Sequence, residues 1–141
     1  MEKIFAIGDI HGCKSHLEKL MATLDINAEH DTLVFIGDYI DRGPDSRGVV
    51  DALLDIRKSI KNVICLRGNH EQMFLNYYLE HRDEDLFMHN GGINTLLSYG
   101  LTSAGKKHLT VPDNHIEFFS TLQTWYMTDN YIFVHAGLRP G

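Results

Sequence analysis

Four short apolar runs recur along the chain, and a polar motif follows each of them directly. The runs are rich in Ile, Val and Phe and lack strict alternation of apolar and polar residues. Unbroken apolar runs of this length are typical of strands that are buried on both faces of a parallel sheet. We therefore predict strands over Ile4–Ile7, Thr32–Ile36, Val63–Leu66 and Tyr131–Val134.

Between the first three runs, apolar residues recur at the spacing of amphipathic helices. Ser15 and Glu18 have the spacing of a capping box, which predicts the start of a first helix. The predicted apolar faces of the two helices are Leu17, Leu20, Met21 and Leu24, and then Val49, Val50, Leu53, Leu54 and Ile60.

The polar motifs after the first three runs are evenly spaced. Asp9 and Asp38, and then Asp38 and Asn69, stand about 30 residues apart, which is the length of one strand–helix–strand unit. Consecutive units of this kind place their strands side by side and parallel, with right-handed crossovers. The predicted fold class is therefore α/β.

The segment from about residue 71 to 129 is too long for one crossover helix, and we predict a helical insertion that forms one wall of the site. Apolar spacing predicts a helix over residues 73–78, a break at Asn90-Gly91-Gly92, a helix that ends at Gly100 and another capped by Asp113. Whether the break also shapes a substrate cleft stays open. No repeat or linker interrupts the sequence, so residues 1–141 are expected to form a single domain.

Composition narrows the classes of function. The net charge is −6, from 13 basic and 19 acidic residues, which disfavours a nucleic-acid-binding surface, although bound divalent ions would offset part of this charge. No apolar run reaches membrane-spanning length, and the N-terminus lacks a signal-peptide pattern. Cys13 and Cys65 do not suggest a disulfide framework, so we expect a cytoplasmic protein. From the charge and the apolar runs, we expect neither nucleic-acid nor membrane partners. The sequence does not indicate the oligomeric state.

The motifs that follow the four runs supply Asp, His, Asn and Arg side chains. They are Gly8-Asp9-Ile10-His11-Gly12, Gly37-Asp38-Tyr39-Ile40-Asp41-Arg42-Gly43, Arg67-Gly68-Asn69-His70-Glu71 and His135-Ala136-Gly137. The carboxyl ends of parallel strands meet at one edge of a sheet, so these side chains should converge there. Carboxylate and imidazole groups bind divalent cations, and paired cations can clamp a phosphoryl group. The pattern indicates a two-metal phosphoesterase.

These motifs resemble those of the phosphoprotein phosphatase family of metallophosphoesterases, over Ile4 to Gly137. The resemblance implies a calcineurin-like sandwich of sheets and two divalent ions, with Mn²⁺ expected and Fe or Zn²⁺ as alternatives. The implied metal ligands are Asp9 and His11 for the first ion, Asp38 as the bridge, and Asn69 and His135 for the second ion.

The resemblance also implies the catalytic roles. Arg42 and Asn69 would bind the substrate phosphate, and His70 would protonate the leaving oxygen while Asp41 orients its ring. A metal-bridging hydroxide would attack phosphorus directly, without a covalent enzyme intermediate. Members of the family continue beyond the last motif with a further histidine ligand, whereas this sequence ends at Gly141. We therefore expect the chain to hold the first half of the family's sandwich.

Several functions agree with this site. The favoured one is hydrolysis of phosphate monoesters as a serine/threonine protein phosphatase, with a phosphorylated protein or a small phosphoester as substrate. Hydrolysis of dinucleoside tetraphosphates by the same site is an alternative, and a non-catalytic metal- or phosphate-binding fragment is another. A nuclease is disfavoured by the acidic charge and by Arg42 and Glu71.

Other polar and aromatic residues receive ordinary interpretations. His115 lacks a partner at ligand spacing, so a solvated or helix-capping position is expected. Trp125 and Tyr126 are expected to pack against the rest of the protein rather than to form a stacking platform.

Overall fold

The computed structural model describes residues 2–102 and 109–139. Within these ranges the strands are β1 (Ile4–Ile7), β2 (Thr32–Phe35), β3 (Asn62–Cys65), β4 (Trp125–Met127) and β5 (Ile132–Val134). The helices are α1 (Lys14–Thr23), α2 (Ser46–Ser59), α3 (Asn69–Tyr78), α4 (Glu84–His89), α5 (Gly92–Ser98) and α6 (Asp113–Thr121).

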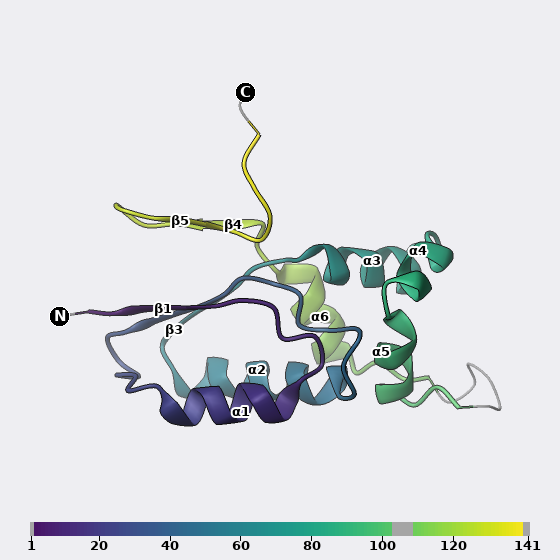
Figure 1. Cartoon of the computed structure of the whole chain (residues 1–141), viewed down its shortest axis with the longest axis horizontal. Coiled ribbons are helices and arrows are strands. Elements are labelled where there is room, and N and C mark those ends of the chain that lie inside the picture. The colour runs from purple at the N-terminus through teal and green to yellow at the C-terminus, as the bar shows by residue number, and fades with distance from the viewer. Residues whose placement is uncertain (1, 103–108, 140–141) are drawn as a thin grey trace.

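The first three strands form a parallel sheet in the order β1-β2-β3, as their spacing predicts. Ile4 is paired with Thr32 and Thr32 with Asn62, so the three strands start in register and end at one common edge. Helices α1 and α2, which connect these strands, cover one face of the sheet (Figure 1). The even register places the three polar motifs side by side.

Strand β2 is the centre of the core. Leu33, Val34 and Phe35 are fully buried, because β2 has a neighbouring strand on each side. The apolar face of α2, with Val49 and Leu53, belongs to the same buried cluster. Burial of whole apolar side chains of this size stabilises the fold by about 1.5–3 kcal/mol each, so the strand that carries the central motif is held firmly.

The prediction that Tyr131–Val134 is a buried parallel strand is wrong. Strand β5 pairs antiparallel with β4, and the link between them closes through a hydrogen bond from the Thr128 N–H to the Tyr131 carbonyl. Only a few residues separate the two strands, and so short a connection joins antiparallel strands, not parallel ones. Trp125 is 54% exposed, whereas Tyr126 is half-buried and stacks on Phe133.

Two predicted helix starts also differ from the structure. Helix α1 is preceded by Cys13 and has no side-chain cap, so Ser15 and Glu18 do not form a capping box there. Helix α6 starts with Asp113 as its first helical residue, after Pro112. Pro112 has the extended backbone conformation typical of the residue before a helix. It therefore takes the N-cap position that the sequence predicts for Asp113.

The segment after the third motif is helical, with α3 starting at Asn69 and α4, α5 and α6 following it. The break at Asn90-Gly91-Gly92 separates α4 from α5, as predicted. His115 is buried and does not have the solvated or capping position expected for it. In the described ranges, no helix combines the length and apolar character that crossing a membrane requires.

Candidate active site

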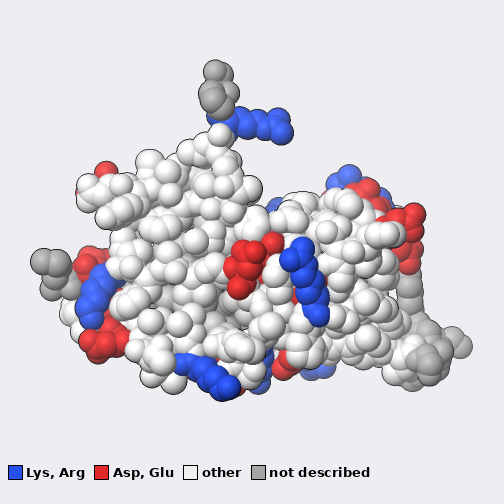
Figure 2. Space-filling model, in the orientation of Figure 1, with Lys and Arg blue, Asp and Glu red and all other residues white. Residues whose placement is uncertain are grey.

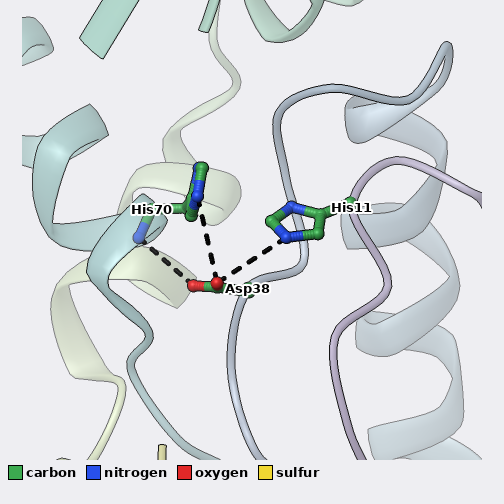
Figure 3. A group of neighbouring side chains, drawn as sticks. All are labelled: His11, Asp38 and His70. Atoms are coloured by element: carbon green, nitrogen blue, oxygen red, sulfur yellow. Dashed lines mark hydrogen bonds and ion pairs between the residues drawn. The ribbon is translucent and has the colours of Figure 1, made fainter. Parts of the chain in front are cut away.

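The predicted site residues converge at the carboxyl-terminal edge of the parallel sheet. Asp9 and His11 follow β1, Asp38 follows β2, and Asn69 and His70 start α3 after β3. Figure 3 shows that the rings of His11 and His70 lie near each other and that both face the carboxylate of Asp38. Residues that are distant in the sequence are therefore brought within a few ångströms of each other.

Asp38 is the centre of the group, and its two oxygens face different partners. Oδ2 lies 3.7 Å from Nε2 of His11 and 3.9 Å from Nε2 of His70. Oδ1 lies 3.3 Å from Nε2 of His135 and accepts a hydrogen bond from the His70 N–H. The carboxylate is buried between the two sides, which is the placement that a bridging ligand requires.

Backbone carbonyls fix the orientation of the two outer histidines. Nδ1 of His11 donates to the carbonyl of Ile40 at 2.8 Å, and Nδ1 of His135 donates to that of Ile36 at 3.0 Å. In both rings Nε2 then faces Asp38. Metal-binding histidines in proteins are held in this way through their second nitrogen.

Several nitrogen and oxygen atoms that can ligate a metal converge here. Nε2 of His11 is buried and has no hydrogen-bond partner among the described residues. Nε2 of His135 lies 3.0 Å from Oδ1 of Asn69 and also faces Asp38. Asp9, whose Oδ2 is 3.8 Å from His11, adds a half-exposed carboxylate. Carboxylate, imidazole and amide donors that converge in this way fit divalent cations.

Asp41 and His70 form a buried pair beside this group. Nδ1 of His70 donates to Oδ2 of Asp41 at 2.6 Å, and both side chains are almost fully buried. Burial alone would lower the pKa of His70, but the hydrogen bond to Asp41 and the charges of Asp38 and Asp41 outweigh it and raise the pKa. Nε2 of His70 lies 3.2 Å from a guanidinium nitrogen of Arg42.

Glu71 joins the second and third motifs, a role that the sequence did not reveal. Its buried carboxylate accepts hydrogen bonds from the N–H groups of Asp38, Tyr39 and Gly68 at 2.8–2.9 Å. Burial raises the pKa of Glu71 to about 7, whereas the three donors stabilise the carboxylate. Only glycine fits at position 68, because an added Cβ would lie 2.1 Å from Oδ1 of Asp38. The presence of Glu71 as the last residue of the third motif was the sequence feature that could have indicated this role.

The site also concentrates unusual backbone conformations. Side-chain-bearing residues rarely adopt positive φ, and such residues often lie at functional sites. Four predicted site residues do so: His11 (φ 44°), Asp38 (55°), Asp41 (71°) and Arg42 (65°). The surrounding hydrogen bonds therefore hold these four residues in conformations that the free chain would seldom populate.

Comparison with known families agrees with this geometry. A profile of the calcineurin-like phosphoesterase family matches residues 2–139. The chain belongs to this family. Its parallel sheet and helices form part of the calcineurin-like metallophosphoesterase fold, and divalent metal ions are the family's cofactor. The fold class predicted from the motifs is confirmed.

Two curated relatives differ in their named activity. Serine/threonine-protein phosphatase 1 of Salmonella typhimurium is 44% identical over 89 residues, which are 63% of this chain and 38% of that protein. The symmetrical bis(5'-nucleosyl)-tetraphosphatase of Nitrosomonas europaea is 28% identical over 136 residues, which are 96% of this chain and 45% of that protein. The chain thus spans less than half the length of either relative.

A solved structure shows the same arrangement of elements. The crystal structure of a candidate diadenosine tetraphosphatase superposes with a TM-score of 0.67 at 27% identity, covering 97% of this chain and 52% of that protein. The resemblance to metallophosphoesterases is therefore confirmed at the level of family and fold. The roles of the individual site residues stay predictions.

Proposed function

We propose that the chain carries the metal-binding part of a phosphoesterase that hydrolyses phosphate monoesters. The observation that carries this proposal is the placement of Asp38, whose two oxygens face His11 on one side and His135 on the other. A buried carboxylate so placed suits two cations that share a ligand. Family membership supports the phosphoesterase class.

The residues present fit two metal sites that share Asp38. Asp9, His11 and Asp38 would hold the first ion, and Asp38, Asn69 and His135 the second. When bound, the ions would neutralise phosphate charge and activate water as a nucleophile. We propose Mn²⁺ as the metal, with Fe and Zn²⁺ as alternatives, since all three accept carboxylate and imidazole ligands.

The remaining site residues would act on the phosphate and the leaving group. Arg42 and Asn69 would bind phosphate oxygens, since a guanidinium fork and an amide both donate hydrogen bonds to them. His70 would donate a proton from Nε2 to the leaving oxygen, because Asp41 holds its Nδ1–H and supports the protonated ring. The oxygen of the attacking water would displace that leaving oxygen directly.

We propose a protein phosphatase as the specific activity, which the 44% identity to the Salmonella protein supports. The match to the Nitrosomonas tetraphosphatase over 96% of this chain supports dinucleoside tetraphosphates as the second candidate substrate. On the face drawn in Figure 2, acidic and basic side chains are interspersed and do not form a broad basic surface. This agrees with a phosphoester substrate smaller than a nucleic acid. A cytoplasmic location stays a prediction.

Turnover of a phosphoserine peptide and of diadenosine tetraphosphate, each with Mn²⁺, would test the proposal. The Asp38→Asn variant is the matched blank, since it keeps the side-chain shape and removes the bridging charge. Faster turnover of the peptide supports a protein phosphatase, and the reverse supports the tetraphosphatase. If the chain binds Mn²⁺ and hydrolyses neither substrate nor p-nitrophenyl phosphate, it is a non-catalytic binding module and the proposal is wrong.

A further inference from the structure

Helix α5 contacts the Asp41–His70 pair through the hydroxyl of Thr95. Oγ1 of Thr95 donates to Oδ1 of Asp41 at 2.6 Å, and the Asp41 N–H donates to the same hydroxyl at 2.9 Å. The Asp41 N–H also lies 3.0 Å from Oγ of Ser46, which in turn lies 2.9 Å from Oγ1 of Thr95. Asp41, Ser46, Thr95 and His70 are all buried, so water is not available to replace these bonds.

The direction of each hydrogen bond follows from counting protons. A carboxylate only accepts, so the single hydroxyl proton of Thr95 goes to Asp41. Ser46 must then donate to Thr95. The result is an ordered chain in which Ser46 donates to Thr95, Thr95 donates to Asp41, and His70 donates to Asp41 from the other side. Thr95 thereby occupies the Asp41 oxygen that His70 does not use.

The same turn of α5 also holds Arg42. The Arg42 N–H donates to the carbonyl of Gly91 at 3.2 Å, and the side-chain amide of Asn94 donates to the Arg42 carbonyl. Gly91 has φ +92°, and a Cβ there would lie 2.9 Å from the Arg42 nitrogen. These contacts act on Asp41 and Arg42, whose positive φ angles require support from their surroundings.

We propose that Thr95 is a positioning residue, which holds Asp41 so that His70 keeps its proton on Nδ1 and presents Nε2 to the leaving oxygen. This inference rests on the proposed phosphoesterase function for its catalytic meaning. It gives a residue of the helical segment 71–129, which lies outside the four motifs, a part in the chemistry. Thr95 itself touches neither substrate nor metal in this scheme.

Two substitutions at position 95 separate the hydroxyl from the shape of the side chain. Thr95→Val keeps the shape and removes the hydroxyl, and Thr95→Ser keeps the hydroxyl. Ser98→Ala is the matched control, because the Ser98 hydroxyl bonds the Thr95 carbonyl and the Arg47 N–H but does not contact Asp41. It loosens α5 without removing a bond to the pair.

Nitrogen-15 NMR of the histidine rings in the metal-free chain reads the effect without needing activity. The His70 signals are assigned by their loss in His70→Asn. In the unmodified chain, in Thr95→Ser and in Ser98→Ala, we expect His70 to carry a proton on Nδ1. The proton resonance of this Nδ1–H should lie downfield and be protected from exchange with water. In Thr95→Val we expect that resonance to shift or disappear. An unchanged resonance in Thr95→Val, or no Nδ1 proton in the unmodified chain, overturns the proposal.

The dependence of rate on the leaving group gives the second readout. Loss of a supporting hydrogen bond of this kind costs about 10- to 100-fold in activity. Thr95→Val should lower kcat for phenyl phosphate by that factor, lower it less for p-nitrophenyl phosphate, and leave KM unchanged, since the better leaving group needs less protonation. Thr95→Ser should restore the rate. An equal loss on both esters indicates a structural role and contradicts the proposal.

The two readouts distinguish the failure of each idea. If the unmodified chain turns over no ester, the phosphoesterase function fails, and the His70 resonance still decides whether Thr95 orders the pair. If turnover is present and the Thr95→Val resonance and leaving-group dependence match those of the unmodified chain, only the role of Thr95 fails.

Discussion

His70 is the residue whose surroundings most clearly suit an acid. Its Nδ1 is bound to a buried carboxylate, and the raised pKa keeps the ring protonated to higher pH than a free histidine. General acids of this kind contribute about 10²–10⁴-fold to the rate.

We expect His70→Ala to lower kcat on a poor-leaving-group phosphate ester by about 10²–10⁴-fold while Mn²⁺ affinity changes little. The reason is that the proposed acid is removed and the metal ligands are not. Steady-state kinetics and calorimetric titration of Mn²⁺ check both parts. A variant with the full rate on such an ester would show that His70 is not the acid.

Glu71 is the residue that the sequence placed in a motif without revealing its role. Glu71→Gln should destabilise the fold by about 1–3 kcal/mol, since the amide would turn a donor toward a backbone N–H and leave it unpaired. Urea unfolding measures the change. The control is Glu117→Gln on the exposed side of α6, which should change stability by less than about 0.5 kcal/mol. Equal effects of the two substitutions would refute the proposed joining role.

At the scale of elements, His115 links three helices. Nδ1 of this buried ring accepts from the Tyr99 hydroxyl at the end of α5, and its Nε2 donates to Asp51 of α2 at 3.0 Å. Both bonds use the neutral ring. Burial lowers the pKa of His115, and the charge of Arg47 lowers it slightly further. The charge of Asp51 and its hydrogen bond raise the pKa, but they do not outweigh burial.

The lowered pKa of His115 predicts a loss of stability in acid. Below the unfolded-state pKa of about 6.5 the unfolded chain binds a proton more readily than the folded one, so the free energy of unfolding should fall as the pH drops from ~7 to ~5. Urea unfolding across this range, compared with His115→Gln, isolates this residue from the other histidines. A variant with the same pH slope as the unmodified chain would rule out His115 as the source.

The elements that the sequence predicted best are those that a local pattern of apolar residues identifies. The three parallel strands and α2 follow from continuous apolar runs and helical spacing. The antiparallel pairing of β5 depends on the short β4–β5 connection. The exposed fraction of Trp125 depends on its tertiary neighbours, which the local sequence does not specify. The contact between Thr95 and Asp41 spans 54 positions, and no local pattern encodes it.

At the scale of the whole molecule, one sheet edge collects residues from both ends of the described chain. His135 and Asp9 lie beside the same buried Asp38, although 126 positions separate them in the numbering. The motifs predicted that the residues after β1, β2 and β3 converge, because parallel strands end together. His135 follows β5, which lies in a separate antiparallel pair, so this reason does not account for its position. The chain covers less than half of the curated relatives described above, so its activity and substrate stay proposals.

The central claim is that Asp38 bridges two divalent ions. Electron paramagnetic resonance of the chain titrated with Mn²⁺ tests it directly, because two ions that share a ligand are magnetically coupled. We predict two bound Mn²⁺ per chain with a coupled spectrum, and loss of the coupling in Asp38→Asn. Binding of one isolated Mn²⁺, or a spectrum that Asp38→Asn does not change, would contradict the account.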